Sequence, residues 1–151
     1  MSESLMSSKF SFMYGGESIV VDLTRFHSIS QVGFVTASRL LDEAVKLMTD
    51  LAVAIPSFEG YHAKNKTAII LHYEMTLTGG MTAKGDPKPP TATSVTTAVQ
   101  GDDRYLTTRI PRDQLLKSYD ALTKIIPILR AQVDKEYAAE NFSASNRKET
   151  T

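Results

Sequence analysis

The chain has 151 residues with a formal net charge of zero, 42% hydrophobic residues and no cysteine. This length and composition fit one globular domain with its own core, and they exclude disulfides and thiolate metal sites. Because no apolar run approaches the roughly 20 residues of a membrane span and the first residues lack the apolar segment of a signal peptide, we expect a cytoplasmic protein without a membrane partner.

The predicted fold class is α+β, with the element order ββ-α-βββ-α. Two long helices would cover one face of an antiparallel sheet of about five strands, which makes a two-layer sandwich. This single domain is expected over residues 9–140. It follows a flexible N-terminus at residues 1–8 and precedes a polar C-terminal tail at residues 141–151.

The first two predicted strands, residues 9–14 and 17–24, flank a pair of glycines. Two glycines between strand-like segments indicate a tight β-hairpin, because glycine adopts the backbone angles that such turns require. A two-residue turn also sets the register of the strands, and here it places Phe10 opposite Val21. The sequence therefore predicts both a hairpin and its pairing.

A capping box at Ser28 and Gln31 predicts the start of the first long helix, because these two side chains satisfy free backbone N–H groups reciprocally. Apolar residues then follow at helical spacing up to about Ile55. Pro56 lacks a backbone N–H and clashes with the preceding turn, so we expect the helix to end there.

Three further strands are expected after a loop. Residues 67–78 alternate between apolar and polar side chains, which is typical of a strand with one covered face, and shorter strands are predicted at 94–99 and 104–110. Residues 79–93 contain three glycines and three prolines and show no periodicity. A loop of about fifteen residues is rare in a compact domain and is often a functional arm or a disordered segment.

The last helix is predicted to begin at Pro111, which suits a first helical position, and to end near Tyr137. Its apolar side chains recur every three or four residues and so share one face. They are Leu115, Tyr119, Leu122, Ile126, Leu129 and Val133. This face must cover either the chain's own sheet or a second subunit. Pro127 predicts a kink within the helix.

The sequence carries none of the short motifs that mark common catalytic or phosphate-binding sites. Its three histidines are far apart in the chain, so we expect no metal site and no cofactor. We therefore expect a protein that is not an enzyme. The one acid–base candidate is His72 with Glu74, on the exposed face of the predicted strand, and a small enzyme built on this pair is the third hypothesis.

The middle of the chain is basic, because residues 61–130 carry ten lysines and arginines against six acidic residues. A polar sheet face with exposed aromatic and basic side chains is typical of proteins that bind single-stranded nucleic acid. The candidate nucleic-acid-binding residues are Lys64, Lys66, His72, Lys84, Lys88, Arg104, Tyr105, Arg109 and Arg112.

The leading hypothesis is a non-enzymatic homo-oligomer, a dimer or larger, that contacts single-stranded DNA or RNA through this sheet face and the lysine-bearing loops. The alternative is a structural or assembly subunit, such as a viral or particle component, which uses the 79–93 loop as an arm between subunits. In both cases the apolar face of the last helix, from Leu115 to Val133, is the candidate oligomer interface.

Overall fold

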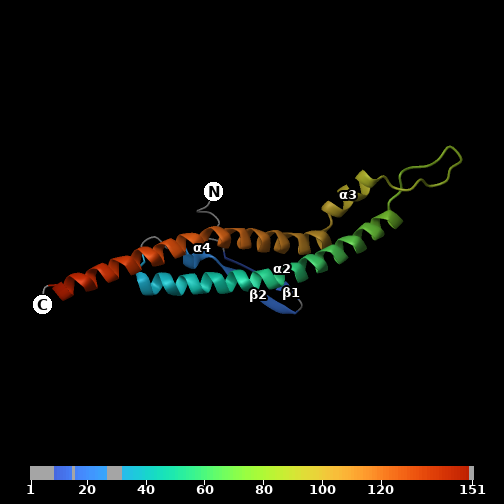
Figure 1. Ribbon diagram of the computed structural model, residues 1–151. Coiled ribbons are helices and arrows are strands. Elements are labelled where there is room, and N and C mark those ends of the chain that lie inside the picture. The colour runs from blue at the N-terminus through green and yellow to red at the C-terminus, as the bar shows by residue number, and fades with distance from the viewer. Residues whose placement is uncertain (1–8, 15, 27–31, 150–151) are drawn as a thin grey trace. The chain divides into compact units, whose positions relative to one another are not determined.

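The computed structural model describes residues 9–14, 16–26 and 32–149, most of which are helical (Figure 1). The strands are β1 (Lys9–Tyr14) and β2 (Glu17–Asp22), and the helices are the short 3-10 helix η1 (Thr24–Phe26) and the α-helices α2 (Phe34–Thr76), α3 (Ala92–Gln100) and α4 (Asp103–Glu149). The predicted α+β sandwich with a sheet of about five strands is therefore wrong.

The hairpin at the start of the chain is the one part of the predicted sheet that the structure confirms. β1 and β2 form a two-stranded antiparallel sheet, and the described residues contain no other sheet. Phe10 lies opposite Val21, as the two-glycine turn predicts, and Lys9 lies opposite Asp22. A two-residue turn sets such a register through its own geometry. The flexible N-terminus expected at residues 1–8 lies outside the described residues.

The first long helix does not end at Ile55, because α2 continues through Pro56 to Thr76. Ala52 and Pro56 are both exposed. Water can therefore bind the Ala52 carbonyl that the proline leaves without a helical partner, which makes a proline tolerable inside the helix. The capping box expected at residues 28–31 falls outside the described part of the chain.

The last turns of α2 occupy most of the segment predicted as a strand at residues 67–78, and that prediction is wrong. The alternating apolar residues also fit a helix, because Ile69 and Tyr73 are four residues apart on one face. Leu71 and Met75 are four residues apart on the opposite face, where they are exposed. A helix with apolar side chains on two faces thus imitates the pattern of a strand.

The short strands predicted at residues 94–99 and 104–110 are also wrong, because these segments belong to α3 and to the start of α4. Thr91 caps α3 and Asp102 caps α4. In each case a side-chain oxygen accepts a hydrogen bond from a backbone N–H of the first turn, at 3.1 and 2.8 Å. These caps favour a helix over the strand that the β-branched residues suggest.

The connection between α2 and α3 is more ordered than the structureless loop predicted at residues 79–93. The N–H of Gly79 donates to the Lys88 carbonyl at 2.9 Å, and the N–H of Thr82 donates to the Asp86 carbonyl at 2.8 Å. A β-bridge joins residues 81 and 87 between these bonds. The connection is therefore a small hairpin with backbone pairing of its own.

α4 contains the predicted last helix but extends beyond it in both directions. It begins at Asp103, before Pro111, and continues past Tyr137 to Glu149. The side-chain cap at Asp102 allows this earlier start. The polar tail expected from residue 141 is accordingly helical as far as the structure describes it.

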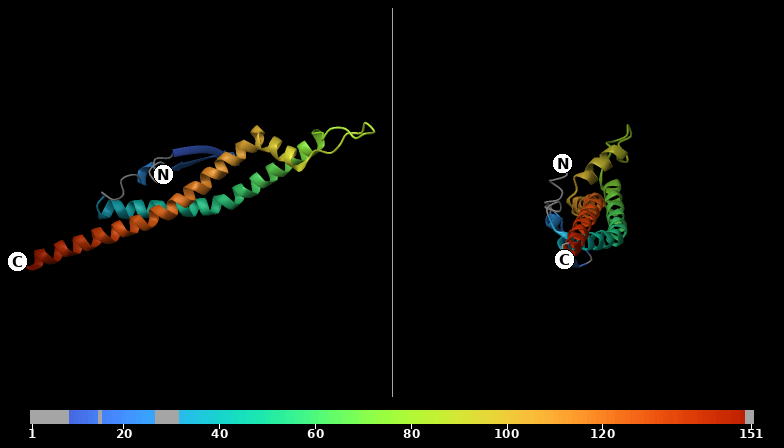
Figure 2. Two further views of the ribbon diagram at one scale, coloured as in Figure 1. Left: turned by 90° about the horizontal axis from the view of Figure 1, so that it is seen from above. Right: turned by 60° about the vertical axis from the view of Figure 1, so that its left-hand side comes forward.

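The chain divides into two compact units, and both α2 and α4 contribute to each. The first unit comprises Met1–Val53 and Leu116–Thr151, and the second comprises Ala54–Leu115. In the first unit the hairpin lies beside the start of α2 and the middle of α4 (Figure 2). Its buried apolar side chains come from all of these segments: Val21, Leu23, Phe26, Ala37, Leu40, Ala44, Leu51, Ala121, Leu122, Ile125, Ile126 and Leu129.

The second unit has a smaller core between the end of α2, α3 and the start of α4. Ile69, Val95 and Val99 are buried at its centre. The partly buried side chains around them are Ile70, Tyr73, Leu77 and Tyr105. All of the residues predicted to bind nucleic acid belong to this second unit.

Candidate functional site

The nine candidate nucleic-acid-binding residues lie on helices and a loop rather than on one sheet face. α2 carries Lys64, Lys66 and His72, the connection to α3 carries Lys84 and Lys88, and α4 carries Arg104, Tyr105, Arg109 and Arg112. The four lysines and the histidine are exposed. The sheet face on which the nucleic-acid hypothesis depended is not formed by the described residues.

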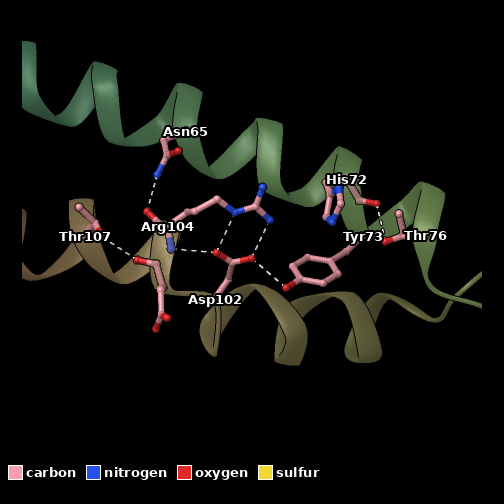
Figure 3. Close-up of polar contacts among 8 residues, drawn as sticks. Asn65, His72, Tyr73, Thr76, Asp102, Arg104 and Thr107 are labelled. Carbon is pink, nitrogen blue, oxygen red and sulfur yellow. Dashed lines mark hydrogen bonds and ion pairs between the residues drawn. The ribbon is translucent and has the colours of Figure 1, made fainter.

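The first of the three arginines is held by a carboxylate and a tyrosine at the turn between α3 and α4 (Figure 3). Arg104 donates from Nε to Asp102 Oδ1 at 3.0 Å and from Nη2 to Oδ2 at 2.8 Å. The hydroxyl of Tyr73 donates to the same Oδ2 at 2.8 Å. The Arg104 bonds first, and then the Tyr73 bond, hold the pKa of Asp102 far below its usual value. The bond to Asp102 also raises the pKa of Tyr73.

The other two arginines also have acidic partners. Arg109 lies 3.7 Å from Asp113, and Arg112 lies 3.6 Å from Glu59 and 3.3 Å from Asp113. Exposed pairs of this kind stabilise a fold only weakly. They do, however, neutralise the positive charge that a phosphate backbone would need to meet.

Tyr105 is not available as a platform for base stacking. It packs against the core of the second unit, and its ring centre lies 5.3 Å from that of His62. The guanidinium of Arg109 lies 5.9 Å from the centre of the same ring. The tyrosine is thus engaged within the chain.

A buried polar cluster between α2 and α4 was missed at the level of the sequence. His62 is only 8% exposed, and its Nδ1 lies 2.7 Å from the Thr108 hydroxyl oxygen. Asn65 donates from Nδ2 to that oxygen at 3.0 Å and to the Arg104 carbonyl at 2.8 Å. The spacing of residues 58, 62, 65 and 69 is helical and could have revealed this inner face of α2.

The environment of His62 opposes its protonation. Burial lowers the pKa of His62 from 6.5, and the positive charges of Arg112 and Lys66 lower it further. The imidazole is therefore held neutral, as a hydrogen-bonding partner of Thr108. A neutral, buried and bonded histidine serves the packing of α2 on α4.

The acid–base pair expected at His72 and Glu74 depended on a strand. On a helix, side chains two residues apart point in nearly opposite directions, so these two do not face each other. His72 instead makes an edge contact with the Tyr73 ring, at 5.2 Å between ring centres. His72 and Glu74 therefore do not lie close enough on α2 to act as an acid–base pair.

The predicted oligomer interface on α4 is largely covered by the chain itself. Of its six side chains, Leu115, Leu122, Ile126 and Leu129 are buried and Tyr119 and Val133 are partly buried. The sequence left open whether this apolar face packs against the chain's own sheet or against a second subunit. Most of the face is already inside the single chain, although that chain contributes helices rather than the predicted sheet.

An uncovered apolar face lies instead on the second half of α2, opposite the buried cluster. We call Tyr61, Lys64, Ala68, Leu71 and Met75 the outer stripe. The exposed fractions of its large apolar members are 52% for Tyr61, 53% for Leu71 and 86% for Met75. The steps of three, four, three and four residues place all five on one side of the helix.

Other features of the described chain point to no further site. Two shallow grooves in the first unit share Arg25 and Glu43, which pair with each other at 2.9 Å. The described residues hold no group of three side chains suited to a metal ion. None of the described helices is long and apolar enough to cross a membrane.

Comparison of the chain with protein-family models, with curated proteins and with solved structures finds no match. The proposed function therefore depends on the geometry of the described residues alone.

Proposed function

We propose that this chain is a structural or assembly subunit that associates with itself through the outer stripe of α2. The observation that carries the proposal is the exposure of Leu71 and Met75, on the side of the helix that faces away from its own core. Burying a leucine or methionine side chain completely contributes about 1.5–3 kcal/mol. A contiguous exposed row of such side chains is typical of a protein interface.

The pattern of the stripe supports a helix as its partner. Tyr61, Ala68 and Met75 are seven residues apart, and Lys64 and Leu71 form a second row with the same spacing. A seven-residue repeat in two rows is the pattern of helices that pack side by side in a coiled coil. The two rows cover about four turns of α2, a length of roughly 20 Å at 1.5 Å per residue.

The adjoining connection adds one more exposed apolar side chain, Met81. Its backbone pairing gives this segment a defined shape, which suits an arm between subunits better than a disordered loop does. Nucleic-acid binding receives less support, because carboxylates neutralise all three candidate arginines.

The proposal is tested by the native mass of the full chain, measured by light scattering over a dilution series. We expect the wild type to exceed the mass of one chain, and Leu71→Glu and Met75→Glu to have the mass of one chain with an unchanged circular dichroism spectrum. Ile110→Glu is the matched control, because Ile110 is a similarly exposed apolar residue on α4. A monomeric wild type, or an unchanged mass in both stripe variants, would refute the proposal.

A further inference from the structure

The outer stripe differs along its length in size and charge, and this difference limits how it can be covered. Bulky side chains stand at Leu71 and Met75 towards one end and at Tyr61 at the other end. The small Ala68 lies in the middle, and Lys64 lies towards the other end. A partner must offer bulk where the stripe is small and a negative charge near Lys64.

Two charged side chains, Lys64 in the stripe and Glu74 beside it, have no partner on their own helix. Lys64 and Glu74 are exposed, and no residue of opposite charge lies three or four positions from either. Within the described part of the chain neither takes part in an ion pair. The face therefore carries one positive and one negative charge at its two ends.

We infer that the occupant of the outer stripe is a second copy of this chain, with the two α2 helices antiparallel about a two-fold axis between residues 69 and 70. This inference rests on the proposed function. In this register Ala68 of each copy meets Leu71 of the other, so a small side chain lies opposite a large one. Lys64 of each copy meets Met75 of the other, against which its aliphatic stem can pack.

The same register brings opposite charges together. Glu74 is adjacent to Met75 in the chain, so the ammonium group of Lys64 reaches Glu74 of the second copy. Two-fold symmetry produces this pair twice. A parallel pairing would instead place Lys64 beside Lys64 and Glu74 beside Glu74, and like charges in such positions select against a partner. Charge complementarity thus favours the antiparallel pair.

A two-fold arrangement also limits the assembly that this surface forms. Each copy uses the same face, so pairing consumes the stripe of both chains and leaves none for a third. The surface therefore produces a closed dimer rather than a filament. A single helix pair is a small interface, so we expect the dimer to dissociate on dilution.

The register is tested by exchanging the two charges in separate full-length variants. Lys64→Glu places two glutamates together, and Glu74→Lys places two lysines together. We expect each variant to raise the dissociation constant of the dimer by about ten-fold or more, because two attractive pairs become repulsive. An equimolar mixture restores both opposite pairs, so its dissociation constant should return close to that of the wild type.

The control for this experiment is Lys84→Glu, because Lys84 is exposed but lies in the connection after α2. It should leave the dissociation constant unchanged. The antiparallel register is wrong if the mixture dimerises no better than its components. If that happens while Leu71→Glu and Met75→Glu still abolish association, the proposed function stands and only the register fails. If those two variants keep the wild-type mass, both fail.

Cross-linking supplies a second measurement of the register, because the chain has no cysteine of its own. We expect a mixture of Lys64→Cys and Met75→Cys chains to form disulfide-linked dimers under mild oxidation. Lys64→Cys alone should not, because the two copies of residue 64 would be about 16 Å apart along the helix axis, well beyond the reach of a disulfide. Equal cross-linking of Lys64→Cys alone and of the mixture would contradict the antiparallel arrangement.

Discussion

The two faces of the second half of α2 differ in how their side chains are satisfied. The inner face buries Phe58, His62 and Ile69 and joins α4 through hydrogen bonds to Thr108. The outer face carries the outer stripe, in which Leu71 is 53% exposed and Met75 is 86% exposed. The fold of the described chain therefore packs the inner face of α2 and leaves Leu71 and Met75 of the outer face exposed.

Truncating one large side chain on each face should have very different effects on stability. Phe58→Ala removes a side chain that is 3% exposed, so we expect the free energy of unfolding to fall by about 3–5 kcal/mol. Met75→Ala should change it by no more than about 0.5 kcal/mol when the chain is dilute and unassociated. Urea unfolding at low protein concentration measures both, and equal losses would show that the two faces are not different.

The polar part of the inner face should respond to the loss of one hydroxyl. Thr108→Val keeps the shape of the side chain but leaves Asn65 and His62 without their shared partner. We expect a loss of about 1–3 kcal/mol in the free energy of unfolding, because His62 stays buried without its partner while Asn65 keeps only its bond to the Arg104 carbonyl. Thr107→Val is the neighbouring control, since Thr107 is exposed and its hydroxyl donates to the Asp103 carbonyl of its own helix. A smaller loss at Thr108 than at Thr107 would contradict the buried network.

The same cluster predicts a dependence of stability on pH. The folded state lowers the pKa of His62 below 6.5 through burial and through Arg112 and Lys66. The unfolded chain therefore binds the proton more readily, so this contribution to stability is complete above pH 6.5 and is lost as the pH falls towards the folded pKa. His62→Gln should flatten this slope, whereas His72→Gln, on an exposed position, should leave it unchanged. An unchanged slope in His62→Gln would show that another group causes it.

Gly60, near the outer face of α2, is the site of the smallest expected change in the free energy of unfolding. A Cβ atom added at Gly60 would meet nothing within 4 Å. Gly60 lies inside α2, where alanine is favoured over glycine, so Gly60→Ala should raise the free energy of unfolding by about 0.5–1 kcal/mol. A loss of stability measured by urea unfolding would indicate that this side of α2 is covered in the chain.

The correct predictions, the hairpin and the helix around Leu122, depend on short stretches of sequence. The hairpin register follows from two glycines, and the helix around Leu122 follows from an apolar row with regular spacing. The helix ends were wrong because Pro56 and Pro111 look like boundaries, yet each lies inside a helix. Whether a helix tolerates a proline depends on whether water or another group can satisfy the freed carbonyl, and that is decided by the tertiary environment.

The candidate site was missed for a related reason. Apolar side chains occupy every second position at Ile69, Leu71, Tyr73 and Met75, which predicts a strand when only residues 67–78 are considered. The longer repeat from Tyr61 to Met75 indicates a helix, and it becomes evident once the segment is joined to the residues before it. The buried contact of His62 with Thr108 joins residues that are distant in sequence, so no local pattern could have predicted it.

The central claim, that the outer stripe joins copies of this chain, is tested most directly by comparing the native masses of wild type and Met75→Glu at one matched concentration. Met75 is the most exposed member of the stripe, so its replacement should disturb association without disturbing the fold. We predict twice the chain mass for the wild type and a single chain mass for the variant, with identical circular dichroism spectra. Equal masses for the two proteins would contradict the claim.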